Sequence, residues 1–403
     1  MVTVTIGKPR AGPRPTIDRM RSARPTALLT AVLVGLLLAG CSGSDGAPAE
    51  SAPTRSVAAS APPPVLVDGW PKADPAALGF RPERLTHLAQ DAKRLDSSCY
   101  AVVRNGRLVG DWNWGLQRLA PREVFSVTKS VTSALVGIAV RDGSLRLGDR
   151  VSRYVPSWRG TDSQSVTVRH LLSNDSGRFW SEQSDYVDMT GARDRTAYAV
   201  ALSQQHPPGS AWAYNNAAIQ VLDRVLEQAT GMPTADFAAK RLFAPLAMTH
   251  TQMTRDASGR STNSYFGLQT TCLDLARFAR LYLEEGTVDG RRILPRAYVE
   301  ASVGASSTTL NAAYGYLWWL NRYGTLRGAT DQVDAAGQPV EVHTGRLVPG
   351  ASPSLYSAIG LGGQIAMVDP RSGTIVVRLG KASPGVQPYG LRNAAKVVTW
   401  ALD

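Results

Sequence analysis

The sequence predicts an α+β domain in which strands from both ends of the chain form one antiparallel sheet. Two strand-like runs, at 97–104 and 107–114, flank Asn105-Gly106, a dipeptide typical of tight hairpins. Further strand-like runs lie within 313–380, near the other end. Between the two sets, residues 151–305 show mostly helical apolar spacing. The simplest assembly is a sheet with the terminal helices packed on it and a mostly helical insert beside it.

The remaining elements follow from local patterns along the chain. Residues 81–95 have helical apolar spacing, and Pro82 favours a helix start. A second helix is expected from Ser126 to Gly143, because glycine is common just after a helix end. The insert contains helix-like segments at 166–173, 217–231, 234–246 and 272–286. Strand-like segments follow at 313–322, 354–363, 364–370 and 373–380, and a last helix is expected at 391–402.

The N-terminus is typical of an export signal. Two arginines precede 14 residues, 27–40, with a single polar side chain; roughly 20 apolar residues are needed to span a bilayer. This run ends in Leu-Ala-Gly-Cys, which resembles a bacterial lipobox, so we expect Cys41 to be acylated and to become the mature N-terminus. The alternatives are an ordinary signal peptide and a buried helix with a chance cysteine. Translation starts at Met1 or Met20.

We therefore expect three regions: a lipoprotein signal peptide at 1–40, a tether at 41–66 and a folded domain at 67–403. Nineteen of the 23 residues in 42–64 are Ala, Gly, Ser, Pro or Thr. Such a segment buries too little apolar surface to offset its ordering entropy, so the tether is expected to be disordered. The expected location is outside the cell, lipid-anchored to the outer face of the cytoplasmic membrane.

The charge and cysteine content fit this location. The formal net charge is +12, and residues 1–40 carry +5 of it, from six basic residues and one acidic residue. The remaining +7 suits anionic lipid or cell-wall polymer. The sequence has no basic block and no nucleic-acid motif, so we expect no nucleic-acid partner. The two cysteines of the domain, Cys99 and Cys272, are expected to form a disulfide in an oxidising compartment, the alternative being two separate buried thiols.

A candidate nucleophile lies at the start of the second expected helix. Ser126 and Lys129 are spaced i, i+3, which places both side chains on one helix face, opposite an apolar stripe. A serine hydroxyl needs a neighbouring base. Only seven of the 44 basic residues are lysines, and a desolvated lysine can lose its proton, whereas arginine cannot. The helix N-terminus would also stabilise developing negative charge near Ser126.

Several segments in order extend this single motif. The segments "FSVTKS" (125–130) and "AYNN" (213–216), with the connecting segments 166–177 and 314–322, resemble the serine β-lactamase and D-alanyl-D-alanine peptidase superfamily. The resemblance covers 69–403. It is nearest to the branch with class C β-lactamases, esterases of the same fold and 6-aminohexanoate-dimer hydrolase. It implies a β-lactamase/transpeptidase-like fold.

The resemblance also implies roles for four residues. Ser126 would be acylated, Lys129 would be its general base, and Tyr214 would shuttle protons between the nucleophile and the leaving group. Asn216 would hold a substrate carbonyl or amide. We expect the Lys129 ammonium to lower the pKa of Tyr214. The alternatives are an ordinary aromatic residue for Tyr214 and a helix N-cap for Asn216.

The family's third motif, on a strand at the edge of the site, has two candidates here. His343-Thr344-Gly345 matches by residue type, and Leu361-Gly362-Gly363 matches by its place between strand-like runs. We favour the second, because two prolines follow the first. The backbone N–H of Gln364 would then complete an oxyanion hole with that of Ser126.

Other polar residues carry less information. The five histidines show no metal-ligand spacing, and no G-x-S-x-G elbow is present, which argues against a Ser-His-Asp triad. His170 is interpreted as structural. Trp180 and Tyr186 are candidates for the wall of the substrate cleft.

Together these patterns predict a membrane-tethered extracytoplasmic serine hydrolase that cleaves an ester or amide through an acyl-Ser126 intermediate. The substrate would be a small molecule or a peptide, and no metal or cofactor is expected. Leu361 cannot pair with a substrate carboxylate, which favours neutral acyl groups. One alternative is a D,D-peptidase or β-lactamase acting on cell-wall peptide or a β-lactam. Another is a non-catalytic binding or sensor lipoprotein. The sequence does not predict an oligomeric state.

Overall fold

A computed structural model describes residues 65–114, 117–329, 342–381 and 383–403. The chain divides into two units, Met1–Ala61 and Pro62–Asp403, and all described residues belong to the second. The expected signal peptide, Cys41 and nearly all of the expected tether lie outside the described residues.

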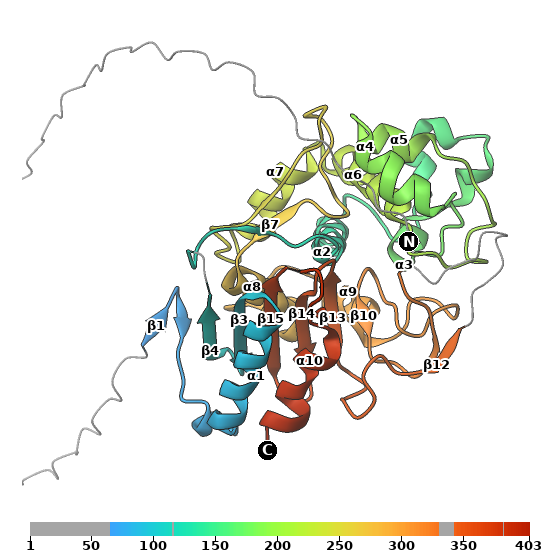
Figure 1. The fold of residues 1–403 in the computed structure, drawn as a ribbon. Coiled ribbons are helices and arrows are strands. Elements are labelled where there is room, and N and C mark those ends of the chain that lie inside the picture. Colours follow the sequence, from blue (N-terminus) through green and yellow to red (C-terminus); the bar gives the residue numbers. More distant parts are fainter. Residues whose placement is uncertain (1–64, 115–116, 330–341, 382) are drawn as a thin grey trace, which may run out of the picture. The chain divides into compact units, whose positions relative to one another are not determined.

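The centre of the domain is a six-stranded antiparallel sheet, in the order β10-β13-β14-β15-β3-β4. The N-terminal hairpin supplies β3 (Ser97–Arg104) and β4 (Arg107–Asn113). The C-terminal part supplies β13 (Tyr356–Gly360), β14 (Gln364–Asp369) and β15 (Thr374–Gly380). β15 pairs with β3, so strands from the N-terminal and C-terminal parts of the domain are neighbours inside the sheet (Figure 1). This confirms the predicted α+β fold.

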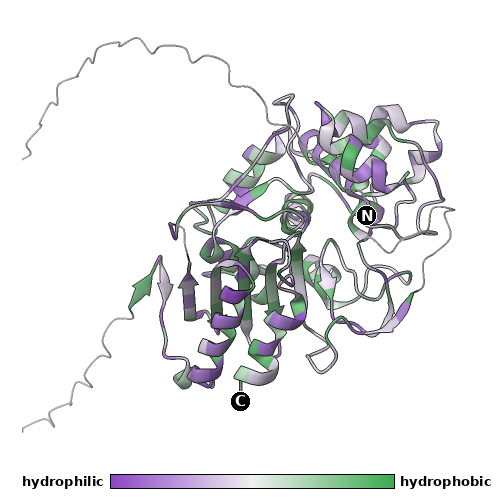
Figure 2. Ribbon diagram, viewed as in Figure 1, coloured by the Kyte–Doolittle hydropathy of each residue, from purple (hydrophilic) through white to green (hydrophobic). Residues whose placement is uncertain are grey.

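Helices cover both faces of the sheet. α1 (Pro82–Arg94), α10 (Leu391–Lys396) and its continuation η8 (Val397–Ala401) lie on one face (Figure 1). α2 (Val127–Arg141) and α8 (Cys272–Leu283) lie on the other. Alternate residues of the central strands enter two separate apolar clusters, which explains why these strands are hydrophobic throughout (Figure 2).

The insert is mostly helical, as expected. It contains α3 (Val168–Ser173), α4 (Met189–Gly191), α5 (Arg195–Ala201), α6 (Asn216–Thr230), α7 (Thr234–Ala238) and the π-helical turns η5 (Gln183–Asp188) and η6 (Ala239–Phe243). A small sheet, in the order β5-β7-β6, joins Arg122–Glu123, Leu268–Thr270 and Gln252–Met253. Only Val124 and Phe125 separate its strand β5 from Ser126.

One strand prediction was wrong in extent. Of residues 313–322, only Trp319–Leu320 (β10) join the sheet, on β13. The preceding residues turn, because Leu317 has a φ of 59° and Tyr314 bridges to Trp319. Tyr314, Tyr316 and Trp318 among them are buried aromatic residues, so the apolar pattern reflects core packing rather than strand alternation.

A disulfide joins Cys99 of β3 to Cys272, the first residue of α8, with their Cα atoms 6.2 Å apart. It fixes the start of α8 to the sheet. Among the described helices, none is both long and apolar enough to cross a membrane.

Candidate active site

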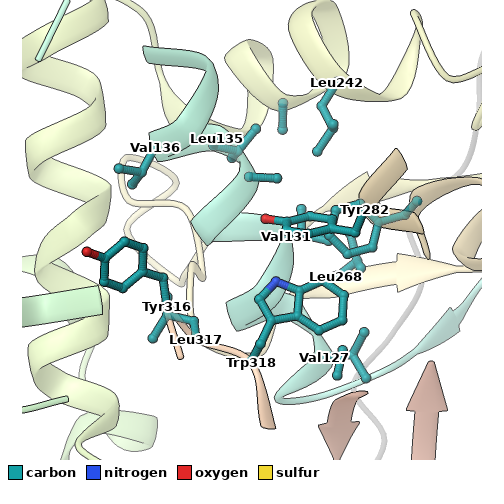
Figure 3. Close-up of a cluster of buried hydrophobic side chains, with 14 of the residues drawn as sticks. Val127, Val131, Leu135, Val136, Leu242, Leu268, Tyr282, Tyr316, Leu317 and Trp318 are labelled. Carbon is teal, nitrogen blue, oxygen red and sulfur yellow. The ribbon is translucent and has the colours of Figure 1, made fainter. Parts of the chain in front are cut away.

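The helix that carries the candidate nucleophile is buried on every side. Val127, Val131 and Leu135 form the expected apolar stripe and pack with Leu268 and Trp318 (Figure 3). The other faces of α2 are buried as well, over 127–139. Buried hydroxyls on those faces are paired with backbone carbonyls, such as Thr132 with Ser264 at 2.7 Å and Ser130 with Leu317 at 2.7 Å. A helix held in this way positions Ser126 rigidly.

Ser126 follows a backbone turn that the sequence did not reveal. Phe125 has a φ of 47°, which is unfavourable for a bulky residue. Hydrogen bonds on both sides hold it, from Val124 N to Leu268 O (3.1 Å) and from Thr128 Oγ1 to Phe125 O (2.6 Å). The turn places Ser126 at the N-cap position of α2, facing a cavity.

Lys129 reaches Ser126 directly. Its Nζ lies 2.7 Å from Ser126 Oγ and donates to Tyr265 O at 3.0 Å. The side chain is only 1% exposed. Burial lowers the pKa of Lys129 to about 7, and the charge of Asp185 opposes this shift. Near neutral pH a large fraction of Lys129 is therefore an uncharged amine that can accept the hydroxyl proton of Ser126.

Tyr214 completes this cluster. Its hydroxyl is hydrogen-bonded with Ser126, and its ring lies 4.8 Å from Lys129 Nζ and stacks on Trp319 at 5.5 Å. Burial raises the pKa of Tyr214 well above its usual value, and the hydrogen bond with Ser126 only partly offsets this. The expectation that Lys129 lowers the pKa of Tyr214 is therefore wrong in direction. Desolvation favours the uncharged amine of Lys129 and keeps Tyr214 a neutral phenol.

The two asparagines after Tyr214 have separate tasks. Asn215 is the N-cap of α6 and accepts a hydrogen bond from Ala218 N at 2.7 Å. Asn216 is the next residue and lines the cavity. Its buried Oδ1 has no hydrogen-bond partner among the described residues, so it is available to accept an N–H of a substrate.

The favoured third motif lies at the site, but only one of its residues faces the cavity. Leu361, Gly362 and Gly363 form the turn between β13 and β14, and of these Leu361 lines the cavity, with 72% of its surface exposed. The competing tripeptide, 343–345, forms β12 on a separate two-stranded ribbon with β11 (Gly324–Leu326). It does not line the cavity.

Gln364 does not fit the role expected of it. It pairs with Gly360 in the sheet, is buried and does not line the cavity. Leu361 does line the cavity, and neither its backbone N–H nor that of Ser126 donates a hydrogen bond to a described residue. Gly360 brings this strand end close to the nucleophile turn: a Cβ there would lie 2.2 Å from Val124 O. The sequence alone gave no reason to single out Gly360.

The cavity beside Ser126 has a volume of about 860 Å³ and mostly apolar walls. These walls comprise Phe125, Tyr186, Tyr265, Phe266, Trp319, Leu347, Ile359, Leu361, Pro388 and Leu391. Tyr186 is on this wall, as expected, but Trp180 is not. Sequence reasoning missed Arg392, the one charged side chain of the wall among the described residues.

The remaining sequence candidates lie elsewhere. His170 forms a capping box with Thr167 at the start of α3, which supports its structural interpretation. Among the described residues, no group of three or more His, Cys, Asp or Glu side chains could hold a metal ion. A hydroxyl next to a neutral buried amine and a phenol, at the end of an apolar cavity, is suited to acyl transfer.

Comparison with known proteins agrees with this chemistry. The family model described as beta-lactamase matches residues 85–399. Penicillin-binding protein 4 of Amycolatopsis lactamdurans is 31% identical over 208 residues, which are 43% of this chain and 53% of that protein. The 6-aminohexanoate-dimer hydrolase of Paenarthrobacter ureafaciens is 24% identical over 343 residues, covering 76% of this chain and 79% of that one.

A solved structure shows the same fold. EstCE1, described as a hydrolase with promiscuous acyltransferase activity, superposes with a TM-score of 0.57 at 19% identity, covering 76% of this chain and 93% of that one. The chain spans about half the length of the penicillin-binding protein that it matches. Because the family model matches most of the domain that contains Ser126, Lys129 and Tyr214, the chain belongs to the β-lactamase family of serine hydrolases.

Proposed function

We propose that this protein hydrolyses an ester or amide with an apolar acyl group, through an acyl-Ser126 intermediate. One observation carries the proposal: the 2.7 Å contact between Ser126 Oγ and Lys129 Nζ, in a buried setting where the pKa of Lys129 falls to about 7. Without that desolvation the lysine would remain an ammonium ion and could not act as a base.

The reaction begins when Ser126 Oγ attacks the substrate carbonyl and its proton passes to the neutral Lys129 amine. Tyr214, a neutral phenol, gives its proton to the leaving oxygen or nitrogen and regains one from Lys129. The leaving group departs and the acyl group stays on Ser126. Water then attacks the acyl carbonyl and gives a proton to Lys129 or Tyr214. These residues pass a proton to Ser126 Oγ as the acid leaves, which restores Ser126.

The oxyanion that forms on the carbonyl needs two N–H donors. We assign these to the backbone N–H groups of Ser126 and Leu361. Both residues line the cavity, and both N–H groups have no partner among the described residues. Ser126 adds the favourable N-terminal end of α2.

The walls of the cavity support an apolar substrate. A volume of about 860 Å³ lies within the range of ordinary small-molecule sites, and aromatic and aliphatic side chains dominate it. Each methylene that moves from water into such a cavity contributes about 0.8 kcal/mol. Leu361, at the mouth, adds apolar area and no charge.

A second candidate is hydrolysis of a carboxylate-bearing substrate, such as a β-lactam or a cell-wall peptide. Arg392 on the cavity wall favours it, because a charge-assisted hydrogen bond contributes about 1.5–3 kcal/mol. The values of kcat/KM for nitrocefin and for p-nitrophenyl butyrate, measured in wild type and Arg392→Ala, decide between the two candidate functions. Efficient nitrocefin hydrolysis that is lost in Arg392→Ala would establish the second candidate.

The main test of hydrolysis is fluorophosphonate labelling followed by intact-mass measurement. We expect one adduct on wild type and none on Ser126→Ala. The adduct should map to the peptide that contains Ser126. Absence of an adduct on wild type over pH 7–9 would favour the remaining alternative, a non-catalytic binding or sensor lipoprotein.

We further propose that Cys41 is lipid-modified and holds the domain at the outer face of the cytoplasmic membrane. The apolar run at 27–40 and the Leu-Ala-Gly-Cys sequence support this. Membrane fractionation should retain wild type and release Cys41→Ser. Equal release of both forms would contradict the anchor.

A further inference from the structure

A buried carboxylate, Asp185, is hydrogen-bonded to the start of the helix that contains Asn216 and has no part in the chemistry described above. It belongs to η5, is 0% exposed, and accepts hydrogen bonds from Asn216 N at 2.6 Å and Ala217 N at 3.0 Å. These are the first two N–H groups of α6. The carboxylate therefore holds the start of the helix that follows Tyr214 and contains Asn216.

The same residue links two walls of the cavity. Its neighbour Tyr186 lines the cavity from η5, and Asn216 lines it from α6. Asp185 joins these elements through two hydrogen bonds that involve a charged acceptor, which are stronger than neutral ones. Loss of the carboxylate would leave two buried N–H groups without a partner.

The surroundings of Asp185 contain one amine that its charge can influence. Lys129, Tyr186, Tyr214 and Tyr265 all interact electrostatically with it. Burial raises the pKa of each of these three tyrosines, so they stay neutral near pH 7. The charge of Asp185 can therefore change the protonation state of Lys129 near pH 7. A nearby carboxylate favours the ammonium form of this lysine.

We propose that Asp185 is a positioning residue for this site: it fixes the segment of Tyr214 and Asn216 against η5, and its buried charge acts on Lys129. The expected effect of Asp185 on the labelling rate rests on the proposed acyl transfer. The effect on Lys129 is a property of the folded chain. Burial raises the pKa of Asp185 to about 6, partly offset by the two backbone hydrogen bonds, so the charge is present above that pH.

A matched control exists in the same helix. Asp223 of α6 is 4% exposed and accepts hydrogen bonds from Thr196 Oγ1 at 2.8 Å and Thr262 N at 3.2 Å. Burial raises its pKa to about 6 as well. It is not among the charges that act on Lys129. Asp223→Asn thus removes a comparable buried carboxylate without removing the one beside the site.

The test is a direct titration of Lys129 in wild type, Asp185→Asn and Asp223→Asn. The chain has only seven lysines, so NMR of protein grown on ¹³C-labelled lysine can follow each one, and Lys129→Arg identifies the signal. Asp185→Asn should lower the pKa of Lys129 by roughly half a unit or more, since a nearby negative charge is lost. Asp223→Asn should leave it unchanged.

The positioning role has its own measurement. At pH 9, where most of the lysine is neutral in every variant, the rate of fluorophosphonate labelling should fall about tenfold or more in Asp185→Asn, and much less in Asp223→Asn. If Asp185→Asn does not fold, Asp185→Ser keeps one hydroxyl acceptor and removes the charge. An unchanged pKa of Lys129, with a rate loss equal to that of Asp223→Asn, would overturn the proposal. Absence of labelling in wild type refutes the acyl transfer instead, and the titration still decides the role of Asp185.

Discussion

Replacing Lys129 by Met should make the protein more stable at low pH while abolishing acylation. The pKa of a free lysine is about 10.4, and burial lowers that of Lys129 to about 7. Burying the ammonium form of Lys129 costs about 1.4 kcal/mol per unit of pKa shift, or roughly 5 kcal/mol at pH 7 and below. Met has a similar length and avoids that cost. It leaves Tyr265 O without its donor, which costs about 1–3 kcal/mol, so Lys129→Met should be about 2–4 kcal/mol more stable at pH 6.

The pH dependence has a definite sign. Between pH 7 and about 10.4 the unfolded state binds the proton of Lys129 and the folded state does not, so wild type gains stability as pH rises. At pH 10 the penalty falls to about 1 kcal/mol, and the advantage of Lys129→Met should vanish or reverse. Urea unfolding of both proteins at pH 6, 8 and 10 measures this. A difference in unfolding free energy that does not change with pH would refute a desolvated Lys129.

Three further predictions concern the frame of the site. Gly360→Ala should greatly reduce labelling of Ser126, because the new Cβ would lie 2.2 Å from Val124 O. Gly148→Ala, with open space around it, should be labelled like wild type. Equal labelling of both variants would contradict the close approach of Gly360 to Val124. Leu361→Lys should raise kcat/KM for nitrocefin relative to p-nitrophenyl butyrate by about 10-fold or more, and an unchanged ratio would exclude contact of this side chain with the substrate. Loss of the disulfide in Cys99→Ser should lower the unfolding free energy by about 2–5 kcal/mol, measured by urea unfolding. Reductant should not lower the unfolding free energy of this variant further.

Local sequence patterns predicted most of the fold because most elements carry their own signals. The helix before the first hairpin starts after Arg81 with Pro82 at its first position, and the hairpin turns at Asn105-Gly106. The strands of the C-terminal part are mostly apolar runs separated by turns. The strand predicted over 313–322 was too long, because aromatic side chains that are buried in a turn are as hydrophobic as those of a strand.

The site was predictable only where a short motif contains it. Ser126 and Lys129 share one turn of one helix, so their contact follows from spacing. Gly360 and Asp185 act through segments that are distant in sequence, Val124 in one case and Asn216 in the other. No local pattern reports such a contact, because the need for a glycine or a carboxylate arises only when the two segments meet.

The error about Tyr214 has the same origin and shows how the site works. Pairwise reasoning placed a charged lysine beside a tyrosine and expected a phenolate. Burial of both groups reverses this, because separating charge inside the domain costs more than the pair regains. The core that packs α2 on all sides is thus what makes Lys129 a base, so the stability of the insert against α2 and the reactivity of Ser126 depend on the same contacts. Water that enters this core should return the lysine to its ammonium form and inactivate the site before the sheet unfolds.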